Sequence, residues 1–130
     1  MRKALIALIV LVSVAGCADE PQTEASYAVA TTGTHDCAKG ANVSIDTSDE
    51  TFKITSTCER VLVKGGNNKI TIEAAKRIDI NGAKNVVEVG AVDTIRVNSS
   101  GNTINYKKTL SGKRSDIVAI GDNNSIIQSR

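Results

Sequence analysis

The chain has 130 residues, with 16 basic side chains, 14 acidic ones and only three aromatic ones. This length fits one small domain, and the near balance of charge excludes a strongly basic nucleic-acid-binding protein. We expect no nucleic-acid partner, because the bases are scattered and few aromatic side chains are present to stack on nucleotides.

The first residues have the pattern of an export signal. Arg2 and Lys3 precede a small or apolar run from Ala4 to Gly16 that only Ser13 interrupts. This run is shorter than the about 20 apolar residues of a membrane-spanning helix. A charged start, a short apolar segment and a small-residue end are typical of a secretory signal. We therefore predict that residues 1–16 are a lipoprotein signal peptide.

The end of the signal, Ser13-Val14-Ala15-Gly16-Cys17, resembles the bacterial lipobox. In that motif the cysteine receives a diacylglyceryl group before the signal is cut just ahead of it. The resemblance implies lipidation of Cys17 and an exported protein held to the cell envelope by stable acyl chains. Ala18 is similar to the outer-membrane sorting pattern, if the source is Gram-negative. The alternatives are an ordinary cleaved signal and a retained membrane anchor.

Residues 17–34 are expected to be a flexible tether that starts at the lipidated cysteine. They are rich in Ala, Thr, Ser, Glu and Gln, contain the only proline, Pro21, and show no sustained periodicity. Tyr27-Ala28-Val29 is the one stretch with the character of a short strand. We place the folded domain at residues 35–130.

Two further cysteines remain, Cys37 and Cys58. In an oxidising compartment we expect them to form a disulfide. The alternatives are two buried thiols and, less favoured, a metal site, because His35 is the only histidine. We expect no metal and no cofactor.

Five copies of one pattern fill the rest of the chain. The strands that open the copies are spaced 18, 17, 17 and 22 residues apart, and they start at Val43, Val61, Ile78, Ile95 and Ile117. In four copies the turn that follows ends in an asparagine, at Asn68, Asn85, Asn102 and Asn124. The first copy has Glu50 at this position, and an insertion at roughly Lys107 to Asp116 lengthens the last interval.

Within each copy, apolar residues alternate with polar ones, as in Val61/Val63 and Ile70/Ile72. This period of two is typical of strands with one buried face. A 17-residue unit is too short for two helices with their turns and too regular for an ordinary sandwich. We therefore predict an all-β fold, a short β-solenoid of about five rungs of 17–18 residues with one Asn-containing turn per rung. The alternative is a β-meander whose hairpins favour Asn and Gly.

The recurring asparagines are predicted to form a ladder along the solenoid axis. A side-chain amide can donate to and accept from the same residue one rung away. Asparagine also tolerates the left-handed backbone of tight turns. Gly65, Gly82 and Gly121, each three residues before an asparagine of the ladder, mark the same corner.

These features resemble a known family. An early cysteine, Cys58 just before a strand, and Gly-x-x-Asn turns at this pitch are similar to the bacterial domain of unknown function 3060 (DUF3060). The resemblance covers roughly Asp36 to Gln128, and Glu50 and the insertion depart from the pattern. It implies secretion and repeats, and it assigns no reaction and no catalytic residues.

We find no catalytic constellation in the sequence and expect no enzyme. No Gly-x-Ser-x-Gly, His-Glu-x-x-His or phosphate loop occurs. Asp79 and Glu88 are expected to face outward on different strands, without the placement of a glycosidase pair. The outward column Leu62, Asp79, Arg96 and Val118 is not the threonine array of an ice-binding solenoid.

The sequence thus favours a membrane-anchored lipoprotein of the cell envelope, a non-catalytic structural or binding module of unknown ligand. Its expected partners are the membrane, through the lipid anchor, and an envelope protein or cell-wall glycan. The alternative function is a carbohydrate- or peptidoglycan-associating protein that uses outward Asn, Thr and Lys side chains. The low aromatic content speaks against tight stacking on sugars. The oligomeric state stays open.

Replacing Cys17 by serine tests the lipid anchor. A hydroxyl cannot carry the thioether-linked diacylglyceryl group, so Cys17→Ser should abolish palmitate labelling and leave the precursor with its signal uncut. The measurement is metabolic labelling of the expressed chain, with Cys37→Ser as the matched control that keeps its label. Normal labelling of the Cys17→Ser chain would contradict the prediction.

Overall fold

The computed structural model describes residues 28–30 and 33–129. The predicted signal peptide, Cys17 and most of the predicted tether lie outside this part. The described part contains nine strands: β1 (Ala28–Ala30), β2 (Gly33–Asp36), β3 (Asn42–Ile45), β4 (Thr51–Val63), β5 (Lys69–Ile80), β6 (Val86–Val97), β7 (Thr103–Lys108), β8 (Asp116–Ala119) and β9 (Ser125–Gln128). Among these residues, no helix is long and apolar enough to cross a membrane.

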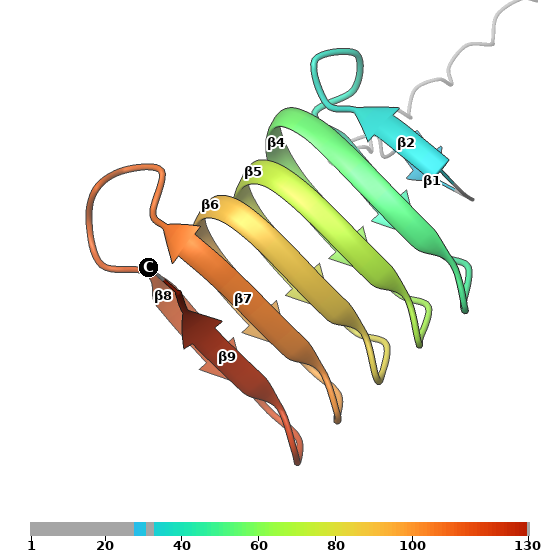
Figure 1. Ribbon diagram of the computed structural model, residues 1–130, viewed down its shortest axis with the longest axis vertical. Coiled ribbons are helices and arrows are strands. Elements are labelled where there is room, and N and C mark those ends of the chain that lie inside the picture. The colour runs from blue at the N-terminus through green and yellow to red at the C-terminus, as the bar shows by residue number, and fades with distance from the viewer. Residues whose placement is uncertain (1–27, 31–32, 130) are drawn as a thin grey trace, which may run out of the picture.

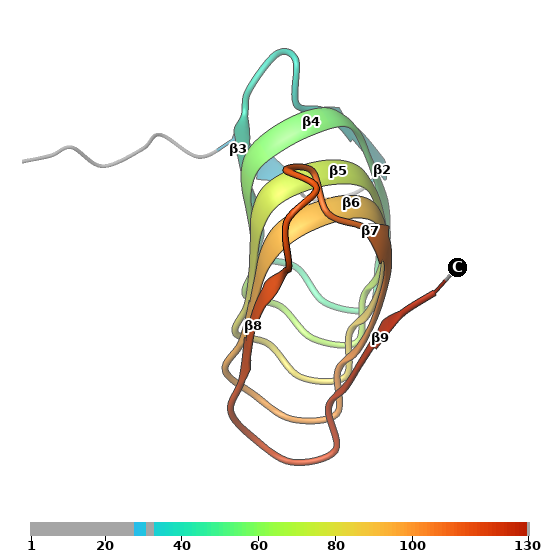
Figure 2. The same ribbon diagram turned by 90° about the vertical axis from the view of Figure 1, so that its left-hand side faces the viewer.

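The strands wind into a β-solenoid with two facing walls (Figures 1 and 2). β2, β7, β9 and the first halves of β4, β5 and β6 form the first wall. β1, β3, β8 and the second halves of β4, β5 and β6 form the second wall. Every pairing is parallel, which excludes a meander of antiparallel hairpins. The predicted all-β solenoid is confirmed, and the five copies make about four turns.

The solenoid begins before residue 35, where the sequence analysis places its start. β1 pairs with β3, with Ala28 opposite Val43, and β2 pairs with β4, with Gly33 opposite Phe52. Short stretches of Ala, Gly and Thr carry little hydrophobic periodicity. They join the sheet because β3 and β4 offer unpaired backbone groups at the edge of the first full turn.

Aliphatic side chains from both walls fill the inside of the solenoid. Ile70 and Ile72 of the first wall and Ile78 and Ile80 of the second wall are at most 1% exposed. Burial of each such side chain contributes about 1.5–3 kcal/mol. The same positions are apolar in successive rungs, so the core is a continuous stack along the axis.

The longer first interval comes from a β-bulge in β4. Ile54 lies opposite Ile72 but Thr57 lies opposite Ala74, so β4 has one residue more than β5 at the bend. Ser56, at the bulge, has a left-handed backbone with φ of 66°. This extra residue explains the spacing of 18 instead of 17.

The long last interval comes from a loop that replaces the bend between the walls. β7 ends at Lys108 and β8 begins at Asp116. The backbone N–H and the Oγ of Ser111 donate to Oδ1 of Asp93 in the preceding rung, at 3.0 and 3.1 Å. These hydrogen bonds to the carboxylate lower the pKa of Asp93. The insertion is therefore tied to the bend of β6.

A disulfide joins Cys37 and Cys58, with a Cα–Cα distance of 5.1 Å. Both residues are buried. Cys58 lies opposite Ala75, and Ala75 lies opposite Val92, so the disulfide continues an inward-facing column at the bend. The covalent link attaches the first, incomplete rung to the rung that follows it.

The turn asparagines stack from rung to rung. The backbone N–H of Asn68 donates to Oδ1 of Asn85 at 3.0 Å, and that of Asn85 donates to Oδ1 of Asn102 at 2.9 Å. The series continues from Asn102 to Asn124 at 3.0 Å. The Nδ2 group of Asn85 donates both to the Gly65 carbonyl and to Oδ1 of Asn102. Each of these side-chain oxygens thus accepts the backbone N–H of the preceding rung, and the predicted amide-to-amide contact joins Asn85 to Asn102 and Asn102 to Asn124.

The left-handed residue of each turn is the one before the ladder position. Positive φ occurs at Asp49, Asn67, Lys84, Gly101 and Asn123. The ladder asparagines themselves are not left-handed, contrary to the expectation for them. The glycines at the corner are required for a different reason, which is the lack of space for a side chain. A Cβ at Gly65 would lie 1.7 Å from the Thr47 carbonyl oxygen, and a Cβ at Gly82 would lie 1.9 Å from the Gly65 carbonyl oxygen.

Two alanine substitutions in adjacent rungs test the ladder. Asn85 is fully buried and Asn98 is exposed. Asn85→Ala removes an acceptor and a donor from buried partners and should lower the free energy of unfolding by about 1–3 kcal/mol. Asn98→Ala should change it by less than about 0.5 kcal/mol, as surface substitutions usually do. Urea unfolding measures both, and equal midpoints would show that the ladder contributes nothing to stability.

Candidate functional site

The outer face of the second wall carries the main concentration of arginine side chains on the described strands. Arg60 of β4 lies opposite Arg77 of β5. In the next outward column, Asp79 lies opposite Arg96 of β6, and Arg96 lies opposite Val118 of β8. The outward column proposed from the sequence is therefore present, with the arginine pair beside it. We call Arg60, Arg77 and Arg96 with Asp79 the arginine face.

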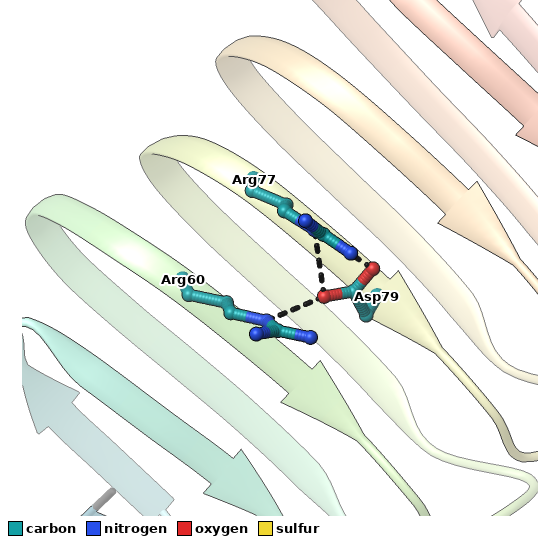
Figure 3. A network of polar contacts seen from close by, with 3 residues as sticks. All are labelled: Arg60, Arg77 and Asp79. Carbon is teal, nitrogen blue, oxygen red and sulfur yellow. Dashed lines mark hydrogen bonds and ion pairs between the residues drawn. The ribbon is translucent and has the colours of Figure 1, made fainter. Parts of the chain in front are cut away.

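Asp79 is held between two of the arginines (Figure 3). Nε of Arg60, from the preceding rung, donates to Oδ2 of Asp79 at 2.5 Å. Nε of Arg77, two residues earlier in the same strand, donates to both carboxylate oxygens, at 3.1 and 3.0 Å. The Asp79 side chain is 8% exposed, whereas the two arginine side chains are 38% and 39% exposed. The guanidinium groups therefore cover the carboxylate and remain accessible themselves.

The in-register stacking of the rungs explains why this carboxylate is present. Arg60 and Arg77 occupy equivalent positions in neighbouring rungs, which lie about 4.8 Å apart. Two guanidinium charges at such a separation repel each other, and a carboxylate between them offsets the repulsion. Asp79 is thus the structural counter-ion of the arginine pair.

The third arginine leaves the face with an excess of positive charge. Arg96 is exposed and makes no ion pair with a carboxylate of the part of the chain that the structure describes. Three guanidinium groups therefore share the face with one carboxylate. The arrangement can bind an anion, because guanidinium groups form strong, bidentate hydrogen bonds with carboxylates and phosphates.

A hollow of about 330 Å³ lies over these side chains. Its polar lining consists of Arg60, Arg77, Asp79, Asn81, Arg96 and Asn98. Its lining on the carboxyl-terminal side includes two apolar residues, Val118 and Ile120, which are 39% and 62% exposed. The hollow therefore joins hydrogen-bonding and cationic groups to a small apolar surface.

The other groups considered from the sequence do not join this site. Asp79 faces outward from the second wall and Glu88 from the first, so the two carboxylates lie on opposite faces. Nε2 of His35 lies 3.0 Å from the Gly40 carbonyl. Within residues 28–30 and 33–129, no three His, Cys, Asp or Glu residues lie close enough to hold a metal ion.

The two carboxylates with a lowered pKa, Asp36 of β2 and Asp93 of β6, accept hydrogen bonds from nearby loops or bends. Donation from Ser56 Oγ at 2.7 Å and from the backbone N–H of Ala38 at 3.0 Å lowers the pKa of Asp36. Asp93 fastens the insertion in a similar manner. Both groups hold a loop in place, and neither lines the hollow of the arginine face.

The cysteines and asparagines predicted as site residues lie in the framework of the solenoid and do not line the hollow of the arginine face. Cys37 and Cys58 lie at the bend, and the four asparagines of the ladder lie at the opposite turns. The sequence analysis described the basic residues as scattered and did not bring the arginines together. The signal was the 17-residue separation of Arg60 and Arg77, which equals the repeat and places them one above the other.

Neutralising Asp79 tests its role as counter-ion. Asp79→Asn keeps the shape of the side chain but removes the charge between the arginines, so the free energy of unfolding should fall by about 1–3 kcal/mol. The loss should shrink as salt is added, because ions screen the repulsion. Glu88→Gln, on the opposite face, is the control and should stay within about 0.5 kcal/mol. Urea unfolding that ranks the two variants alike would contradict the assignment.

Comparison with known proteins finds a family whose model matches part of the repeat region. Residues 45–89 match the family described as "Protein of unknown function (DUF3060)". This match is narrower than the resemblance seen in the sequence, because it begins at the end of β3, covers β4 and β5 and ends within β6. No curated protein and no solved structure matches the chain. The solenoid contains a DUF3060-like domain.

Proposed function

We propose that the protein is a non-catalytic binding module of the bacterial cell envelope, anchored by lipid at Cys17, and that its arginine face binds an anionic ligand. The excess of guanidinium groups over the single carboxylate at an accessible hollow supports the binding role. The export signal and the lipobox-like segment support the location. Expected partners carry carboxylates or phosphates.

Arg77 and Arg96 retain donors for a ligand in the presence of Asp79. Arg77 uses Nε for both of its hydrogen bonds with the carboxylate, so its two terminal nitrogens remain as donors. Arg96 makes no ion pair with a carboxylate of the described residues, so no such pair occupies its guanidinium group. A ligand anion can therefore bind without displacing Asp79.

A cell-wall glycan is one candidate ligand for this face. The two aromatic side chains in the described part, Phe52 and Tyr106, are 2% and 5% exposed, so neither can stack on a sugar ring. Recognition of a glycan at this face would therefore depend on charge and hydrogen bonds. Such recognition selects the anionic material of the cell wall, including the carboxylates of peptidoglycan.

Co-sedimentation with purified cell-wall material tests the proposal. The lipidated protein, held in detergent, should sediment with the cell wall at low salt and be released as salt is raised, because charged contacts are screened. Arg96→Gln should weaken binding roughly tenfold, as expected for loss of one charge-assisted contact.

Lys53→Gln is the control for this experiment. Lys53 is also exposed and cationic, but it points outward from the first wall. It should bind as the parent protein does. Binding that survives both substitutions equally, or that does not respond to salt, would contradict a binding role for the arginine face.

A further inference from the structure

The insertion between β7 and β8 opens the inside of the solenoid at its carboxyl-terminal end. In the earlier rungs an inward column of Cys58, Ala75 and Val92 fills the bend, and these residues are fully buried. Pairing of β6 with β7 ends at Ala91, and pairing of β6 with β8 resumes at Thr94, so the described pairings continue this column no further than Val92. In Figure 1 the loop between β7 and β8 stands out from the row of bends in β4, β5 and β6.

A hollow of about 700 Å³ lies at this end of the solenoid. Its lining includes Tyr106 and Ile117, which take the inward registers of Val89 and Ile95 in the preceding rung. Ile95 is fully buried, whereas Ile117 is 39% exposed. The inside that is covered in the earlier rungs is therefore partly open here. We call this space the loop hollow.

Three cations line the loop hollow. Lys108 is the last residue of β7, and Lys113 and Arg114 belong to the insertion. All three are exposed, and none forms an ion pair with a carboxylate of the described residues. The described residues that line the hollow include no Asp or Glu. The arginine face has Asp79 to offset part of its charge, whereas the lining of the loop hollow has no such carboxylate.

Hydrogen bonds hold the insertion in place beside the hollow. Ser111 donates twice to Asp93 of the preceding rung, and its Oγ accepts the backbone N–H of Lys113 at 3.2 Å. The hydroxyl of Tyr106 lies 2.9 Å from Oγ of Ser115. A loop that is already ordered loses less conformational entropy when a ligand binds.

The charge of the lining indicates the class of ligand. A carboxylate carries one negative charge, whereas a phosphate monoester carries about two and presents three strong acceptor oxygens. Lysine and arginine both bind phosphate through charge-assisted hydrogen bonds. Ile117 adds an apolar surface beside these cations. A doubly charged group joined to a small organic part therefore matches both halves of the lining.

We infer that the loop hollow binds a phosphate monoester, with the phosphate on Lys108, Lys113 and Arg114 and the organic part against Ile117. The site is separate from the arginine face, because the two hollows share none of their lining residues. The inference goes beyond the proposed function and does not depend on it.

Titration with phenyl phosphate tests the site. The lipidated full-length protein, labelled with ¹⁵N, is held in a maltoside detergent that contains no phosphate. The backbone amide signals of Gly112 and Ser115 should shift and reach saturation. Benzoate has the same ring with a single charge, and it should bind roughly tenfold more weakly, as expected for loss of one charge-assisted contact. Benzyl alcohol, which is neutral, should leave these signals unmoved.

Charge-removing variants test the residues. Lys113→Gln and Arg114→Gln should each weaken phenyl phosphate roughly tenfold and keep the urea midpoint of the parent protein, because both side chains are exposed. Lys107→Gln is the matched control. Lys107 is also exposed and lies next to Lys108, but it lines a different hollow, together with Glu88. This variant should bind phenyl phosphate as the parent protein does.

Two further probes distinguish the sources of the phosphate. Glycerol 3-phosphate carries the monoester in solution, and dihexanoyl phosphatidic acid carries it as a lipid headgroup in the same detergent. Tighter binding of the phosphatidic acid would support the inference with a lipid as the ligand. Equal binding of the two would support it with a soluble phosphorylated molecule as the ligand.

Three results would overturn the inference. The first is a shift of the Arg96 and Asn98 signals while those of Gly112 and Ser115 stay unmoved, since the phosphate would then bind only the arginine face. The second is benzoate binding as tight as that of phenyl phosphate. The third is equal affinity of Lys107→Gln and Lys113→Gln. The proposed function would survive each of them, because its test depends on Arg96.

Discussion

Stacking of each residue on its equivalent in the next rung is the constraint on which this structure depends. Parallel backbone pairing brings equivalent positions within about 4.8 Å, so a side chain that suits one rung must also suit its own copy. Aliphatic side chains meet this condition inside, and the asparagines meet it at the turns because an amide both donates and accepts. Gly65 and Gly82 meet it by having no Cβ where a carbonyl oxygen of the preceding rung lies.

Side chains of like charge are unfavourable in such a stack, because equivalent positions in neighbouring rungs bring the charges close together. The arginine pair on the second wall repeats a cation on adjacent rungs, and the structure offsets this with a sheltered carboxylate from the neighbouring column. The third arginine has no such carboxylate among the described residues, and a hollow opens over all three. The close arginines, which are unfavourable for the solenoid alone, are therefore well suited to bind an anionic ligand.

The sequence predicted the features that depend on period and missed those that depend on contacts between rungs. Five copies with a 17-residue repeat are enough to predict a solenoid, its inward faces and its turn asparagines. The sequence marked the region of β1 as a short strand-like stretch within the tether but missed β2, because pairing at an edge needs backbone groups more than an apolar pattern. The Arg60–Asp79 ion pair joins residues 19 positions apart, which is close to the repeat but diagonal to it. Only the register of the strands brings these two side chains together.

The ladder also has a direction. In every turn from Glu50 to Asn102, the backbone N–H finds its side-chain acceptor in the rung that comes later in the chain. Each turn therefore depends on the turn that follows it in the chain for this acceptor. At the amino-terminal end of this series, the Cys37–Cys58 disulfide attaches the first, incomplete rung to the rung that follows it. Loss of the last turn would therefore leave the backbone N–H of Asn102 without the Oδ1 of Asn124, so this dependence runs from Asn124 back to Glu50.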